Sequence, residues 1–81
     1  MYAIEYKTDS CDVCKTVEKN LKASGIKYTS LDRKQCRAKL YKTPYTEFYS
    51  DDGTLVDHRI GLISIYDIRH IISTYDSKKA Y

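Results

Sequence analysis

The sequence predicts an α/β domain in which a compact, four-stranded mixed sheet is flanked by helices. Three observations indicate it: the first half alternates strand-like and helix-like segments, a hairpin turn signal follows, and helical periodicity returns near the end. A chain of 81 residues suffices for one domain with a modest core. We therefore expect residues 1–81 to form a single domain, in which residues 76–81 are a loose tail.

The first half has the pattern of a β-α-β unit. Residues 2–7 have strand-like composition, and residues 26–31 alternate along a second strand. From residue 11 to residue 24, apolar side chains recur every four positions on one helix face: Val13, Val17 and Leu21. Gly25 is placed to end this helix in a left-handed cap. Because a helix connects the two strands, we expect them to be parallel.

A short helix is expected after the second strand. Asp32 can cap it, and its apolar positions are Cys36 and Leu40, four residues apart. Thr43-Pro44 ends it, because proline lacks the backbone N–H that a helix interior needs.

A hairpin and a last helix complete the chain. Residues 45–49 and 54–60 predict strands, and the Asp51-Asp52-Gly53 segment between them is typical of a hairpin turn, so the pair is antiparallel. Ser64 and Asp67 form a capping pair at the start of the final helix. Apolar side chains then line one face: Ile65, Ile68, Ile71, Ile72 and Tyr75. The predicted order is therefore β-α-β-(short α)-β-β-α.

Composition and charge are typical of a globular protein in solution. Hydrophobic residues make up 42% of the chain and charged residues 31%, and no apolar run approaches the ~20 residues of a membrane helix. The first residues lack the basic and apolar regions of a signal peptide. The formal charge is +3, and we interpret the basic residues between positions 33 and 42 as a solvated helix face. We therefore expect a cytoplasmic monomer with no nucleic-acid or membrane partner.

Cys11 and Cys14 are the most informative residues in the sequence. They lie at the start of a predicted helix, where residues three apart share one face, so their sulfurs can bond. Unpaired N–H groups and the helix dipole at that end favour the thiolate. Cys11 lies at the exposed helix entrance, whereas Cys14 lies one turn deeper, on the core side. We therefore predict that Cys11 attacks a substrate and that Cys14 resolves the product.

Two other interpretations of the cysteine pair stay open at this point. A zinc site uses the same spacing but needs two further ligands, and the candidates, Cys36, His58 and His70, show no paired spacing. The pair could also be two free structural cysteines. The β-α-β context favours a redox-active pair with no bound metal. The odd total of three cysteines argues against a structural disulfide framework.

The chain resembles the thioredoxin/glutaredoxin superfamily over residues 2–76, in particular its small phage and bacterial members. Residues 6–14 resemble the strand, loop and Cys-x-x-Cys entry of small glutaredoxins. Thr43-Pro44 resembles the loop whose proline is cis in that family and lies against the cysteines. The hairpin over residues 45–60 resembles the third and fourth strands, and residues 61–64 resemble the thioredoxin ending.

The resemblance implies a thioredoxin fold and a thiol–disulfide oxidoreductase that reduces protein disulfides through a Cys11/Cys14 dithiol, with no bound cofactor. It implies a substrate site at Thr43 and Pro44, to which Tyr45 and Lys7 contribute. It suggests ribonucleotide reductase as an electron acceptor, with a thioredoxin-reductase-like enzyme or glutathione as the electron source. The alternative is a binding module, a thioredoxin fold that grips a partner protein with its cysteine face without turnover.

The glutathione site is expected to be incomplete. The glutaredoxins that this chain resembles usually hold glutathione with three groups. These are a basic residue before the Cys-x-x-Cys motif, the loop around the proline, and an acidic residue after a glycine-rich turn. Lys7 can supply the first of these groups. However, no acidic residue follows Gly61 before Asp67, so the third group is absent from its usual place.

Overall fold

The computed structural model describes residues 1–36 and 42–76. Its elements, in chain order, are β1 (Tyr2–Lys7), α1 (Asp12–Ser24), β2 (Lys27–Asp32), η1 (Arg33–Gln35), β3 (Tyr45–Tyr49), β4 (Leu55–Ile60) and α2 (Ile65–Asp76). The predicted order is confirmed, but the short element after β2 is a 3₁₀ helix of three residues. The expected tail at residues 77–81 and the expected helix position Leu40 lie outside the described residues.

The four strands form one mixed sheet in the order β2-β1-β3-β4. β1 pairs with β2 in parallel, as the intervening helix predicts, and β3 pairs with both β1 and β4 antiparallel. Tyr6 of β1 lies between Leu31 of β2 and Tyr45 of β3. The carboxyl ends of β1 and β2 therefore meet the start of β3 at one end of the sheet.

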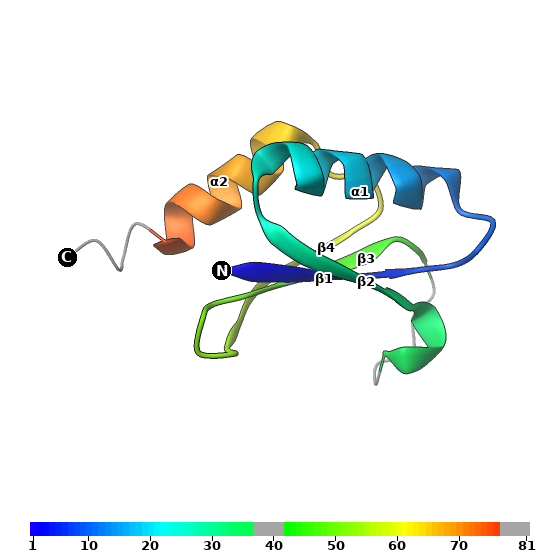
Figure 1. Ribbon diagram of the computed structural model, residues 1–81, viewed down its shortest axis with the longest axis horizontal. Helices are drawn as coiled ribbons and strands as arrows, with labels where there is room; N and C mark the ends of the chain where they lie inside the picture. The colour runs from blue at the N-terminus through cyan, green and yellow to red at the C-terminus, as the bar shows by residue number, and fades with distance from the viewer. Residues whose placement is uncertain (37–41, 77–81) are drawn as a thin grey trace.

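Both α-helices cover the same face of the sheet, as Figure 1 shows. The core between the helices and the sheet is built from eight buried side chains: Ala3, Val17, Leu21, Ile26, Phe48, Ile63, Ile68 and Ile71. The opposite face carries stacked tyrosine pairs, Tyr2 with Tyr49 and Tyr6 with Tyr45. No helix among residues 1–36 and 42–76 is long and apolar enough to cross a membrane.

The helix boundaries follow from local capping. Gly25 ends α1 with φ at 83°, a left-handed conformation that favours glycine, and its N–H donates to the Lys22 carbonyl. At the start of α2, the Asp67 N–H donates to the Ser64 hydroxyl and the Ser64 N–H donates to the Asp67 carboxylate. Both predicted caps are confirmed.

Candidate active site

Cys11 and Cys14 form a disulfide at the start of α1, with their Cα atoms 5.2 Å apart. Cys11 is the N-cap residue of the helix, and its Sγ accepts a hydrogen bond of 3.1 Å from the Cys14 N–H. Its own N–H donates to the Thr8 carbonyl, which turns the chain from β1 into the helix. Cys11 is partly exposed, whereas Cys14 is only 1% exposed. The two sulfurs therefore differ in their access to a partner molecule.

The Thr43–Pro44 peptide bond is cis and lies at the same end of the sheet as the disulfide. Tyr6 pairs with Tyr45, so Pro44 enters the sheet beside the end of β1, from which the chain continues to Cys11. Pro44 is buried, and its carbonyl accepts a hydrogen bond of 2.8 Å from the Gly61 N–H. This bond fixes the end of β4 to the loop before β3.

Exposed apolar side chains occur in the segments around the disulfide and Pro44. Val13, between the two cysteines, is 44% exposed, so it does not share the buried helix face predicted for it with Val17 and Leu21; Cys14 takes that place. Ile60 and Leu62 flank Gly61, the residue bonded to Pro44, and are 60% and 62% exposed. We call these three residues the apolar rim. Burial of such aliphatic side chains against a partner protein would favour association, because removing apolar surface from water is favourable.

Tyr45 and Lys7, predicted as substrate-binding residues, are engaged within the protein. The Tyr45 ring stacks on Tyr6, and its hydroxyl donates to Glu47. Burial, followed by the charge of Glu47, raises the pKa of Tyr45 to about 12. The Lys7 ammonium lies 3.1 Å from Glu18 Oε1, and the hydrogen bond to Glu18 raises its pKa. Substrate binding by these two residues stays a prediction.

A buried polar cluster, which the sequence reasoning missed, lies between α1 and the sheet. Glu5 of β1 is fully buried, and its Oε1 is 3.0 Å from the Ser30 hydroxyl oxygen of β2. The same hydroxyl oxygen is 2.6 Å from Glu18 Oε1 of α1. Burial raises the pKa of Glu5 from 4.5 to about 7, although the hydrogen bond with Ser30 opposes the rise.

One signal in the sequence could have found Glu5. In a strand, residues two apart lie on the same face, so Glu5 shares the face of Ala3, which packs in the core. A carboxyl on the inward face of a strand needs partners or loses its charge. Those partners, Ser30 and Glu18, lie far from Glu5 in the sequence.

The zinc alternative finds no support in the described part of the chain. Among residues 1–36 and 42–76, no three His, Cys, Asp or Glu side chains are grouped as a metal site requires. Cys36 is a free, half-buried thiol, and His58 packs against the Tyr45 ring with centroids 5.9 Å apart. Neither residue joins the disulfide in a shared site.

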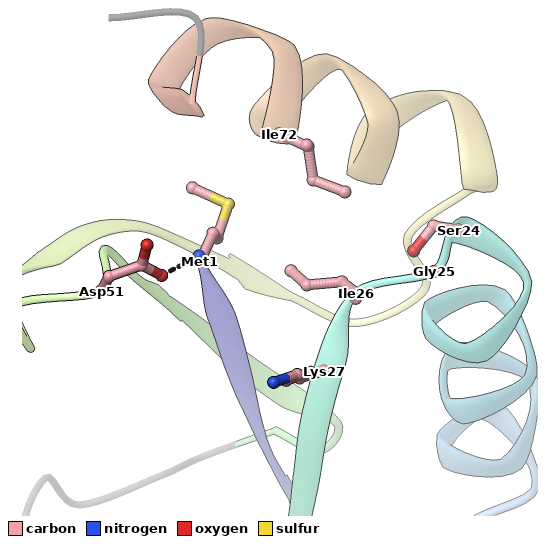
Figure 2. Close-up of a pocket in the computed structure, with 7 residues that line it drawn as sticks. All are labelled: Met1, Ser24, Gly25, Ile26, Lys27, Asp51 and Ile72. Carbon is pink, nitrogen blue, oxygen red and sulfur yellow. Dashed lines mark hydrogen bonds and ion pairs between the residues drawn. The ribbon is translucent and has the colours of Figure 1, made fainter. Parts of the chain in front are cut away.

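A pocket of about 330 Å³ lies away from the cysteines, as Figure 2 shows. Its walls come from the start of β1, the end of α1 and the start of β2, together with Asp51 and Ile72. The Met1 ammonium forms an ion pair with Asp51 at its edge. Because β1 runs from this pocket toward the disulfide, the pocket lies at the opposite end of the sheet and takes no part in the dithiol site.

The comparisons with known proteins support the fold. The structure is similar to that of thioredoxin 1 from the thermophilic eubacterium Thermosipho africanus TCF52B, with a TM-score of 0.71 and 17% identity over 100% of both chains. No protein family model and no curated protein matches the sequence. The chain therefore has a thioredoxin-like fold with a Cys-x-x-Cys pair at the start of its first helix.

Proposed function

We propose that the protein is a thiol–disulfide oxidoreductase that reduces protein disulfides through Cys11 and Cys14. The observation that carries the proposal is the asymmetric disulfide: Cys11 is accessible at the helix N-cap, and Cys14 is buried one turn along. The Cys14 N–H and the helix dipole stabilise negative charge on the Cys11 sulfur, and the thiolate is the reactive form of cysteine.

Reduction starts from the dithiol. The Cys11 thiolate attacks one substrate sulfur, a mixed disulfide forms, and the other substrate sulfur leaves as a thiolate. Cys14 then loses its proton and attacks the Cys11 sulfur, which releases the second substrate thiolate and forms the Cys11–Cys14 disulfide. The substrate gains two electrons and the protein loses two.

Because Cys14 is buried, the proton that it loses needs an acceptor inside the protein. Glu5 is a fully buried carboxyl between β1 and α1, and its Oε2 has no hydrogen-bond partner among the described residues. Glu18, which shares Ser30 with Glu5, follows Cys14 by four residues and lies on the same face of α1. We assign Oε2 of Glu5 as the atom that receives this proton.

A protein substrate suits this site better than glutathione does. The apolar rim offers aliphatic contacts to a substrate segment that carries a disulfide. Glutathione is a charged tripeptide, and the acidic residue that glutaredoxins place after the glycine turn is absent before Asp67. We infer that a thioredoxin-reductase-like enzyme, rather than glutathione, returns electrons to Cys11 and Cys14. Ribonucleotide reductase remains the acceptor that the resemblance suggests.

The test is reduction of insulin disulfides by dithiothreitol, with the protein as catalyst. We expect catalytic turnover that is lost in Cys11→Ser. A stoichiometric complex with a partner and no turnover would support the binding-module alternative instead. The electron source is tested by reducing the oxidised protein with NADPH and thioredoxin reductase, against glutathione with glutathione reductase, and we expect the first pair to act faster.

A further inference from the structure

The Ser30 hydroxyl lies between two carboxyl groups, and its hydrogen count constrains their charge. Its oxygen is 3.0 Å from Glu5 Oε1 and 2.6 Å from Glu18 Oε1. A hydroxyl has one hydrogen to donate and two lone pairs that accept. It can therefore donate to only one of these carboxyls. The other contact is a hydrogen bond only when that carboxyl is protonated and donates to the Ser30 oxygen.

The surroundings identify Glu5 as the protonated partner. Glu5 is fully buried and its Oε2 has no partner in the described part of the chain, an arrangement that costs a carboxylate more than a neutral acid. Glu18 is partly exposed and also accepts from Lys7 at 3.1 Å. The 2.6 Å contact has the length of a hydroxyl bond to a carboxylate. Glu5 thus donates to Ser30, and Ser30 donates to Glu18.

The opposite pKa shifts of the two carboxyls agree with this assignment. Burial raises the pKa of Glu5 to about 7. Burial acts in the same direction on Glu18, but the hydrogen bonds from Ser30 and Lys7 outweigh it and hold the pKa of Glu18 below its ordinary value. Near neutral pH, Glu5 therefore holds a proton and Glu18 holds a negative charge.

We propose that Glu5, Ser30 and Glu18 form a proton relay that carries the proton of Cys14 from the buried layer beneath α1 to the surface beside Lys7. In one passage the Cys14 S–H bond breaks and Glu5 Oε2 gains that proton, while the Glu5 Oε1–H bond breaks and Ser30 gains the second proton. The Ser30 O–H bond breaks at the same time, and Glu18 gains the third proton. Glu18 then releases its proton to water. Rotation of the Glu5 carboxyl and of the Ser30 hydroxyl restores the starting arrangement. The inference rests on the proposed function, which supplies the proton.

Among residues 1–36 and 42–76, few other charges face the relay. Lys7 from β1 and Lys15 from α1 lie near Glu18 and favour its ionised form. On β3, the residue paired with Glu5 is Thr46, whose buried hydroxyl carries no charge. The next residue across the sheet is Arg59 of β4, and its guanidinium is paired with Asp57 at 3.2 Å. The charge at the outlet is therefore set mainly by Glu18 and Lys7.

Carboxyl titration in the oxidised protein tests the relay without turnover. The chain has three glutamates, so selective ¹³C labelling gives three carboxyl signals, which Glu→Gln variants assign. In the wild type we expect the Glu18 signal to show a second inflection at the midpoint of Glu5, because the two groups titrate as a pair. In Ser30→Ala the second inflection disappears, because the hydroxyl that couples the two carboxyls is lost.

The resolving step supplies a second readout. In stopped-flow release of substrate from the mixed disulfide near neutral pH, Ser30→Ala and Glu18→Gln should each slow the Cys14 attack by about tenfold or more, as general acid–base residues do. Ser30→Thr keeps a hydroxyl and should restore both the rate and the shared inflection. Thr29→Ala, an exposed neighbour on β2, is the matched control and should change neither.

Any of three results would overturn the relay. The first is a Ser30→Ala variant whose titration curves and rate of Cys14 attack match those of the wild type. The others are a Ser30→Thr variant slowed as much as Ser30→Ala, and a Glu18→Gln variant with the wild-type rate. If Ser30→Ala fails to fold, Glu18→Gln decides the question. A wild type that reduces no disulfide would overturn the proposed function. The titration would still test the coupling of Glu5, Ser30 and Glu18 separately, because it is measured on the oxidised protein without any substrate.

Discussion

The N–H of Cys14 donates a hydrogen bond of 3.1 Å to the Sγ of Cys11. The bond places the accessible sulfur at the N-cap of α1, where N–H groups without helical partners and the helix dipole attract negative charge. When the disulfide is reduced, the same position stabilises a thiolate on Cys11. The buried Cys14 has no comparable access to a substrate, which supports the proposed roles, in which Cys11 attacks and Cys14 resolves.

Trapping of a mixed disulfide should separate these steps. Cys14→Ser is expected to accumulate a covalent complex between Cys11 and a protein substrate, because attack proceeds and resolution is blocked. Cys11→Ser should form no such complex. Non-reducing electrophoresis with mass spectrometry of the linked peptide measures the outcome. A substrate linked through Cys14 in the Cys11→Ser variant would reverse the assignment.

Glu5 should make stability depend on pH. Its folded pKa of about 7 exceeds its ordinary 4.5, so its contribution is fully present below about pH 4.5 and is lost as pH rises through 7. At 1.36 kcal/mol per unit of pKa, the loss amounts to about 3 kcal/mol. The contribution of Glu18 depends on pH in the opposite direction. Because the pKa of Glu18 is lowered, its stabilising contribution is lost as pH falls.

The measurement is the free energy of unfolding of the oxidised wild type and Glu5→Gln at about pH 5 and about pH 8. Glutamine cannot ionise, so the variant should lose less stability than the wild type between the two conditions. Glu47→Gln is the control, since Glu47 lies on the other face of the sheet, bonded to the hydroxyls of Tyr45 and Tyr49. Parallel pH profiles for wild type and Glu5→Gln would contradict the buried-acid account.

Local signals in the sequence predicted much of this fold. The bounds of β3 were predicted to the residue, because its aromatic and β-branched composition ends at clear turn signals. The Gly25 and Ser64–Asp67 caps were also correct, since caps depend on neighbouring residues. The Cys-x-x-Cys spacing placed both cysteines at the start of α1, where the structure joins them.

The remaining features depend on contacts between distant segments. The helix expected after Asp32 is a three-residue 3₁₀ helix: the Asp32–Gln35 capping box starts it, and the extended backbone of Cys36 ends it. Alternation along β1 predicts the face on which Glu5 lies, but only the parallel register brings Ser30 beside it. Glu18 joins them because α1 packs across both strands. No local pattern encodes this three-element contact.

Cys36 should be dispensable for turnover. It is a free thiol after η1, outside the Cys11–Cys14 disulfide, and it is half-buried rather than presented to a substrate. Cys36→Ala should retain insulin reduction within about twofold, because the Cys11–Cys14 dithiol stays intact. The fold should also be kept, since substitutions away from special sites usually change stability by under about 0.5 kcal/mol. A variant that folds normally but loses most activity would show that this thiol takes part in the reaction.

The apolar rim should determine affinity for protein substrates. Leu62 is 62% exposed and lies next to Gly61, whose N–H bonds to Pro44. Burying an aliphatic side chain against a partner contributes about 1.5–3 kcal/mol, so Leu62→Asp, which also adds a charge that must be desolvated, should raise KM for a protein disulfide about tenfold or more. The value of kcat should change less, because the dithiol itself is intact.

Leu55→Asp provides the matched control for Leu62→Asp. Leu55 is 46% exposed and begins β4 beside the hairpin turn, at the end of the sheet opposite Pro44. The substitution introduces the same charge and removes a similar area, so it should leave KM unchanged. A small linear disulfide such as bis(2-hydroxyethyl) disulfide, which is too short to reach the rim, should be turned over equally by both variants and the wild type. Equal KM values for the protein substrate in both variants would show that Leu62 does not contact the substrate.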